Sequence, residues 1–327
     1  MPTLTLAQKE AFLNEFKGTI FEYRLAWALA KSGGFEVSFL ASLPSAAQAR
    51  LEEYERLIWQ LDPALAKSLE QWPLEVAAQL QAALPASLKA INWVGRQEKQ
   101  AWQEADLLAQ DAAGRTYPLS LKLSKDQAFV NTKSGGAKSF LTQYFSACPH
   151  AAAAQAELNN LIERGFLTLG MELYQQQNLG IFMGCFDERW ILPHLPGQMP
   201  AELRPLIWQY YSKIAAYLAQ LFQNWQREAR FQAALAPIFG FGRPDLWQVN
   251  CFYQKDPWRL KHTIILPPPW VAEQIKALHW RPYEAGAIYF NGEFPEGTLQ
   301  IRAKPMNVFT VAALKINCAL RHRLSES

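Results

Sequence analysis

The spacing of apolar residues changes several times along this chain, and these changes restrict the folds that it can adopt. Near the N-terminus, apolar residues recur at steps of three and four, and Phe12, Phe16 and Ile20 share one face of an expected helix. Gly33-Gly34 is expected to end that helix. Later segments alternate apolar and polar residues, which is typical of strands. Because a chain with both periods folds as an α/β or α+β protein, we expect a fold of this class.

The remaining elements follow from the same two periods. Segments rich in Ala, Leu, Gln and Glu, which are strong helix formers, predict further helices at 46–61, 64–83, 138–146, 151–176 and 206–235. Strands are predicted at 90–97, 102–110, 116–123, 179–186, 247–254, 260–266, 287–290, 298–304 and 312–320. We also expect a polar loop over 124–136, a proline-rich connector over 191–205 and a turn at Asn291-Gly292.

The length of 327 residues suggests two domains. Residues 1–195 are expected to form a core with a helical insertion at about 45–90. Residues 196–327 are expected to form a long helix followed by a β-rich region. Half of the residues are apolar, which excludes a disordered chain. The net charge is only +3, so any surface that binds nucleic acid must be a local patch.

The four cysteines do not have the spacing of a structural metal cluster. Cys148, Cys185, Cys251 and Cys318 include no C-x-x-C pair, and we expect four reduced thiols. The chain contains no apolar stretch of about 18 residues, and its N-terminus lacks the apolar core of a signal peptide. It also lacks the glycine motifs of nucleotide-binding loops. We therefore expect a cytoplasmic protein that uses neither a membrane nor an organic cofactor.

Two short polar patterns suggest a chemistry. Glu104-Ala105-Asp106 and Ser120-Leu121-Lys122 lie on two expected strands of one hairpin. Because alternate side chains on a strand share a face, the hairpin would bring a carboxylate beside an ammonium group at one edge of a sheet. A carboxylate and a backbone carbonyl can bind Mg²⁺, which lowers the pKa of a bound water, and a lysine can orient that water. Asp106 is the expected metal ligand, and Lys122 is the expected second group.

This arrangement resembles the PD-(D/E)XK nuclease superfamily, in which an acid at the end of one strand precedes (D/E)-x-K on the next strand. Asp106 matches the first acid and Lys122 matches the lysine, whereas Ser120 stands where the family has its second acid. The resemblance covers about residues 15–165, interrupted by the helical insertion. It implies a mixed central sheet flanked by helices. It also implies a Mg²⁺-dependent nuclease core with these three residues in its catalytic group.

The carboxylate that Ser120 replaces has two candidates in the sequence. Gly18-x-x-x-Glu22 on the first helix resembles the Gly/Glu-bearing helix of junction resolvases and several restriction enzymes, whose glutamate faces the metal. Glu22 is therefore one candidate metal ligand, and Glu104 is the other. The structural alternative is a cross-strand ion pair between an Asp and a Lys, with the helix glutamate on a solvated face.

Basic residues gather in two segments. Residues 115–140 hold five basic residues and one acid, and residues 227–327 hold 13 basic and eight acidic residues. Lysines bind phosphates as point charges, backbone amides over 134–137 would cradle a phosphate, and Arg, Lys and Asn can read base edges. The alternatives are a solvated loop and an ordinary half-exposed sheet. The expected DNA-binding residues are Lys125, Asn131, Lys133, Lys138, Arg302, Lys304, Asn307 and Lys315.

Together these patterns predict a Mg²⁺-dependent endonuclease that hydrolyses double-stranded DNA, with a type II restriction endonuclease as the first expectation. Cleavage of a palindromic site would require a homodimer, because the symmetry of the protein matches that of the site. The alternatives are a nuclease of repair, recombination or defence, and a DNA-binding protein that no longer cuts, which Ser120 favours. An unrelated soluble enzyme or interaction protein is the remaining possibility.

Overall fold

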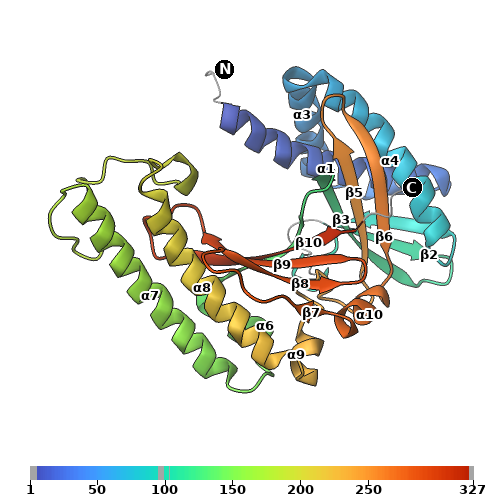
Figure 1. Cartoon of the computed structure of the whole chain (residues 1–327). Coiled ribbons are helices and arrows are strands. Elements are labelled where there is room, and N and C mark those ends of the chain that lie inside the picture. The colour runs from blue at the N-terminus through green and yellow to red at the C-terminus, as the bar shows by residue number, and fades with distance from the viewer. Residues whose placement is uncertain (1–5, 95–98, 103, 324–327) are drawn as a thin grey trace. The chain divides into compact units, whose positions relative to one another are not determined.

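The structure is a computed structural model that describes residues 6–94, 99–102 and 104–323. It is a mixed α/β protein with two five-stranded sheets and flanking helices (Figure 1). The chain divides into two compact units, each built from two stretches of sequence. The first unit is Met1–Ala128 with Phe241–Trp270, and the second is Phe129–Gly240 with Val271–Ser327. The division therefore falls at 128, 240 and 270, whereas the sequence analysis placed one boundary at 195.

The first unit begins with four helices. They are α1 (Leu6–Ser32), α2 (Glu36–Ser42), α3 (Ser45–Leu61) and α4 (Pro63–Ala83). Gly34 follows α1 with a φ of 77°, a conformation that glycine adopts without strain. Asp62 caps α4 by accepting a hydrogen bond of 3.0 Å from the amide of Leu65. The helices expected at 46–61 and 64–83 are thus confirmed as α3 and α4.

The sheet of the first unit is mixed. It has the order β1 (Leu88–Trp93), β2 (Leu107–Asp111), β3 (Thr116–Lys125), β5 (Trp247–Gln254) and β6 (Arg259–Leu266). β3 and β5 are parallel, and the other neighbours are antiparallel. Helix α1 packs on the sheet through Leu25 and Leu29, in one core with Leu119 and Val249. The strands expected at 247–254 and 260–266 therefore belong to this sheet and not to a separate C-terminal region.

The segment before β2 differs from the expectation. A short helix, α5 (Lys99–Trp102), occupies the start of the strand expected at 102–110, and β2 begins only at Leu107. Residue 103 of that strand, and residues 95–97 of the strand expected at 90–97, lie outside the described residues. Glu104 and Asp106 consequently precede β2 and do not alternate along it.

The sheet of the second unit is antiparallel throughout. Its order is β4 (Val130–Gly136), β10 (Leu314–His322), β9 (Gly297–Pro305), β8 (Tyr289–Phe294) and β7 (His279–Trp280). The helical elements are the 3₁₀ turns η1 (Ala137–Ser139) and η2 (Pro196–Gln198), with α6 (Phe140–Tyr144), α7 (Ala151–Gln176), α8 (Arg204–Trp225), α9 (Ala229–Ala234) and α10 (Trp270–Lys276). Phe222 of α8 packs edge-on against Trp280 and Phe290, which buries one face of this sheet.

Several expectations for the second unit are wrong. The polar loop expected at 124–136 is largely strand β4, the helix expected at 206–235 is interrupted after Trp225, and Asn291-Gly292 lies inside β8. Strand β4 tolerates polar residues because only Val130 of the strand is buried.

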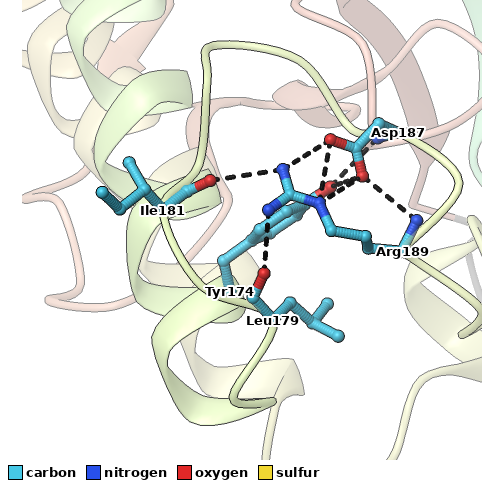
Figure 2. Close-up of polar contacts among 5 residues, drawn as sticks. All are labelled: Tyr174, Leu179, Ile181, Asp187 and Arg189. Atoms are coloured by element: carbon cyan, nitrogen blue, oxygen red, sulfur yellow. Dashed lines mark hydrogen bonds and ion pairs between the residues drawn. The ribbon is translucent and has the colours of Figure 1, made fainter.

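The strand expected at 179–186 is an irregular segment, held by Arg189 (Figure 2). The Arg189 guanidinium donates hydrogen bonds to the carbonyls of Leu179 at 2.9 Å and Ile181 at 3.2 Å. It also pairs with the Asp187 carboxylate, which accepts from the Tyr174 hydroxyl. Because a guanidinium satisfies these carbonyls, the segment needs no neighbouring strand. The apolar pattern was therefore misleading.

Within the described part of the chain, no helix has the length and apolar character that a membrane crossing requires.

Candidate metal site and nucleic-acid surface

Asp106 is fixed where β1, β2 and β3 meet. Its backbone amide donates to the carbonyl of Leu119 at 2.8 Å, and its carbonyl accepts from the amide of Val94 at 2.9 Å. The side-chain Oδ2 accepts a hydrogen bond of 2.8 Å from the amide of Leu121. The last pair in the β2–β3 ladder is Leu107 with Leu119. Beyond that pair, the Asp106 carboxylate accepts from the Leu121 amide where a main-chain carbonyl would accept in a longer ladder. Asp106 is 6% exposed, and its carboxylate is held against β3.

Ser120 and Lys122 flank that contact on the opposite face of β3 from α1. The Cα partners of these two residues on β5 are Gln248 and Asn250, so four polar side chains share this face. Ser120, Gln248 and Asn250 are at most 2% exposed, and Lys122 is half-buried. The described residues show no ion pair between Asp106 and Lys122, so the cross-strand ion pair of the structural alternative is not formed.

Glu22 lies at the same end of the sheet as Asp106 but on the side of α1. Its Oε2 accepts a hydrogen bond of 3.4 Å from the indole nitrogen of Trp93. Trp93 is the Cα partner of Leu107, the residue that follows Asp106. The structure therefore brings Glu22 to the sheet end that holds Asp106. It does not place Glu22 on the face of Ser120 and Lys122.

Glu104, the other candidate ligand, holds a neighbouring segment of backbone. Its Oε2 accepts a hydrogen bond of 3.0 Å from the amide of Gly242. A Cβ atom at Gly242 would lie 2.4 Å from that oxygen, so glycine permits the approach. Arg243 lies over the ring of Trp102 at 4.7 Å, which ties the same two segments together. These contacts give Glu104 a structural role.

The described carboxylates near Asp106 are too few for a metal site made by the protein alone. Across the residues with described placement, no group of three or more His, Cys, Asp or Glu side chains could form an all-protein cage. Mg²⁺ commonly binds through one or two carboxylates, waters and substrate phosphates instead. Asp106, with Glu22 at the same sheet end, supplies that smaller set.

A cationic group lies on one face of the sheet in the second unit. The strand register pairs Arg302 with Asn317 and Lys304 with Lys315. Residues that alternate with these, such as Ile316 and Cys318, are fully buried on the other face. We call Arg302, Lys304 and Lys315 the cation group. In the described part of the protein, no carboxylate forms an ion pair with any of the three.

Electrostatics identify the cation group as a site of unbalanced positive charge. The pKa of Lys304 is lowered, first by burial and then by repulsion from Lys315 and Arg302. Like charges on neighbouring strands destabilise a sheet unless an anion neutralises them. The arrangement can therefore bind a phosphate.

The other residues predicted to bind DNA lie in several places. Lys125 ends β3 in the first unit, and Lys133 of β4 lies 5.5 Å from the ring centre of Tyr144. Lys138 forms an exposed ion pair of 2.8 Å with Glu163. Asn307 is exposed between β9 and β10. Lys133 and Lys138 therefore have contacts of their own within the second unit.

The phosphate cradle expected over 134–137 does not form as a loop. Ser134, Gly135 and Gly136 are instead the end of β4, and all three have Cα partners on β10. A Cβ atom at Gly135 would lie 3.2 Å from the ring of Tyr144, so this glycine permits close packing.

Sequence reasoning missed several polar residues beside these sites. Gln248 and Asn250 of β5 face the same way as Lys122, and Asn317 of β10 faces the same way as Lys315. The signal was their spacing of two residues along strands that were otherwise predicted correctly. Asn131 was predicted, but its partner Asn317 was not.

Comparisons of the chain with protein-family models, with curated proteins and with solved structures find no significant match.

Proposed function

We propose that this protein is a Mg²⁺-dependent endonuclease that hydrolyses phosphodiester bonds of double-stranded DNA. The observation that carries the proposal is the contact of the Asp106 carboxylate with the Leu121 amide, between Ser120 and Lys122 on the next strand. A helix that bears Glu22 packs on the same sheet. This order of helix, acidic residue and lysine is the one implied by the resemblance to the PD-(D/E)XK superfamily.

The chain's own residues have distinct roles in this proposal. Asp106 binds the metal through its carboxylate, which lies against β3. The bound Mg²⁺ would lower the pKa of a water and neutralise charge on the phosphate. Lys122 orients the attacking water and stabilises negative charge on the phosphoryl oxygens. The water oxygen forms a bond to phosphorus, one ester P–O bond breaks, and the leaving oxygen takes up a proton.

Ser120 is the weakest element of this site, because a neutral hydroxyl is a poorer ligand for Mg²⁺ than a carboxylate. We assign the second carboxylate to Glu22, since Glu104 is engaged with Gly242. Glu22 would reach the metal by turning its side chain from Trp93 around the end of the sheet.

The finer form of the proposal is a type II restriction endonuclease that acts as a cytoplasmic homodimer. Its support is the cation group on the second unit, which is separate in sequence from the proposed metal site and could bind the DNA of a recognition site. The second candidate is a DNA-binding protein that no longer cuts. Ser120 at the position of the second acid is the observation that favours it.

A digest of long phage DNA tests these candidates. The full chain is incubated with unmodified DNA in Mg²⁺ or in EDTA, beside the Asp106→Asn variant, and the products are resolved on a gel. Discrete bands that require Mg²⁺ and Asp106 are the expected result for a restriction endonuclease. A smear would support another nuclease. Intact DNA that nevertheless binds the protein would contradict cleavage and leave the binding protein.

A further inference from the structure

We propose that Asn131 reads an adenine edge in duplex DNA and that Asn317 is the positioning residue that orients it. The inference rests on the DNA binding of the proposed function but not on cleavage. Asn131 was predicted only as a residue that contacts DNA. The inference names the base that it reads, the hydrogen bonds that it makes and Asn317 as the residue that orients it.

A β-bulge aims Asn131 at Asn317. The register between β4 and β10 shifts near Thr132, so Asn131 pairs with Ala319 while Ser134 pairs with Asn317. The Thr132 hydroxyl donates to the carbonyl of Ile238 at 2.6 Å and lies 3.1 Å from that of Cys318, which anchors the bulge. Bulges re-aim side chains and are frequent beside functional sites.

The hydrogen bond between the two amides fixes the orientation of Asn131. The Asn317 Nδ2 donates to the Asn131 Oδ1 at 2.7 Å. Asn317 is 8% exposed, whereas Asn131 is exposed. The Asn131 side chain therefore presents an outward Nδ2 donor and a second lone pair on Oδ1. A donor beside an acceptor is the pattern that complements N7 and N6 of adenine in the major groove.

Further amide and cationic side chains surround this pair on the same face. Ala319 pairs with Asn131 on one side and with Gln300 on the other. Because the side chain of Ala319 is only a methyl group, it leaves space between the two amide side chains. Arg302 pairs with Asn317 itself. Adjacent strands are about 4.8 Å apart, so the cation group begins one strand from the paired amides. Phosphate binding by that group would bring a base edge within reach of Asn131.

The test measures base preference without cleavage. The full chain, in EDTA, is incubated with a pool of randomised duplexes, and the bound fraction is sequenced. Wild type is expected to enrich a motif that contains adenine. Asn131→Ala is expected to lose the preference for that adenine by roughly ten- to hundredfold, because one bidentate contact is removed. Lys304→Gln is the matched control. It should weaken all sequences alike and reduce the salt slope by about one.

Two variants of Asn317 test its positioning role. Asn317→Asp has nearly the same shape but cannot donate, so the Asn131 amide is expected to turn and the adenine preference to fall. Asn317→Gln keeps the donor and is expected to retain more of the preference. Thermal melting of both variants controls for folding, and a purely structural role would change melting without changing base preference.

The inference is overturned if wild type enriches no motif, or if Asn131→Ala keeps the adenine preference. Failure of the proposed cleavage is a separate result. If the protein enriches the motif in EDTA but leaves DNA intact in Mg²⁺, cleavage is rejected and the inference about Asn131 stands. Cleavage at a site whose preference ignores Asn131 would reject the inference alone.

Discussion

The amide of Leu121 donates its hydrogen bond to the side chain of Asp106 and not to a main-chain carbonyl. A carboxylate thus completes the edge of a β-ladder. Asp106 thus supports the fold, and its carboxylate is also assigned to the metal in the proposed function. The two roles can be separated by substitution.

Asp106→Ala is expected to abolish cleavage and to destabilise the protein by about 1–3 kcal/mol, because the buried Leu121 amide loses its acceptor. Asp106→Asn keeps an acceptor but removes the charge, so it should abolish cleavage with a smaller loss of stability. Denaturant unfolding and the DNA digest measure the two effects. Full cleavage by either variant would reject the metal assignment.

Glu22→Gln and Glu104→Gln distinguish the two candidate carboxylates. We expect Glu22→Gln to reduce cleavage by at least about a hundredfold and to leave stability nearly unchanged, since an amide oxygen can still accept from Trp93. Glu104→Gln should leave the cleavage rate within a few-fold of wild type. Initial cleavage rates of the two variants on one plasmid substrate give the comparison. A larger loss for Glu104→Gln than for Glu22→Gln would assign the second metal ligand to Glu104.

Gly297→Ala is expected to destabilise the second unit by roughly 2 kcal/mol or more. A Cβ atom there would lie 2.2 Å from the carbonyl oxygen of Arg321, so β9 and β10 must move apart. Gly197→Ala is the matched control, because a Cβ atom at Gly197 meets no atom within 4 Å. The free energy of unfolding in denaturant gives the comparison, and equal values for both variants would contradict the packing argument.

Because Lys17 is buried, the stability of the protein is expected to rise with pH. This lysine is 7% exposed and hydrogen-bonds to the hydroxyl of Tyr253. Burial, followed by repulsion from Lys125 and Lys255, lowers the pKa of Lys17 from 10.5 to about 8. Between these values the unfolded chain binds more protons than the native protein, so the free energy of unfolding rises with pH. The cost of burying the charged lysine is complete below about pH 8 and is lost as the pH rises toward 10.5.

The measurement for Lys17 is a difference between proteins. The free energy of unfolding of wild type minus that of Lys17→Met is expected to increase between about pH 7 and about pH 10. Taking the difference removes the effect of tyrosines that do not contact Lys17 and titrate in the same range. A difference that stays constant over this interval would show that the lysine is not buried as described.

The sequence predicted long regular elements well and the local geometry of the site poorly. The helix at 151–176 and the strand at 247–254 have the predicted bounds, because their apolar periods extend over several turns or a full strand. Strand β4 was not predicted, since its Ser-Gly-Gly end has the composition of a loop and is specified by pairing with β10.

The candidate site was predicted as residue types and not as an arrangement. Asp106 and Lys122 were placed on neighbouring strands, and the structure has Asp106 just before β2 and Lys122 on β3. The position of Glu104 was wrong because α5 ends at Trp102, where the strand was expected to start, and β2 begins only at Leu107. The segment at 179–186 failed for a different reason. Its carbonyls are satisfied by Arg189, a partner ten residues from Leu179 that no local period reveals.

The parallel pairing of β3 with β5 has a consequence for how this protein can be made and dissected. Between these neighbours, the chain runs from 126 to 246 and builds most of the second unit. During synthesis, β3 cannot pair with β5 until residues 126–246 have left the ribosome. A single truncation after residue 128 removes two of the five strands of that sheet, β5 and β6, along with the second unit. Isolating the first unit therefore requires excision of residues 129–240, re-joining of the two ends and removal of residues 271–327.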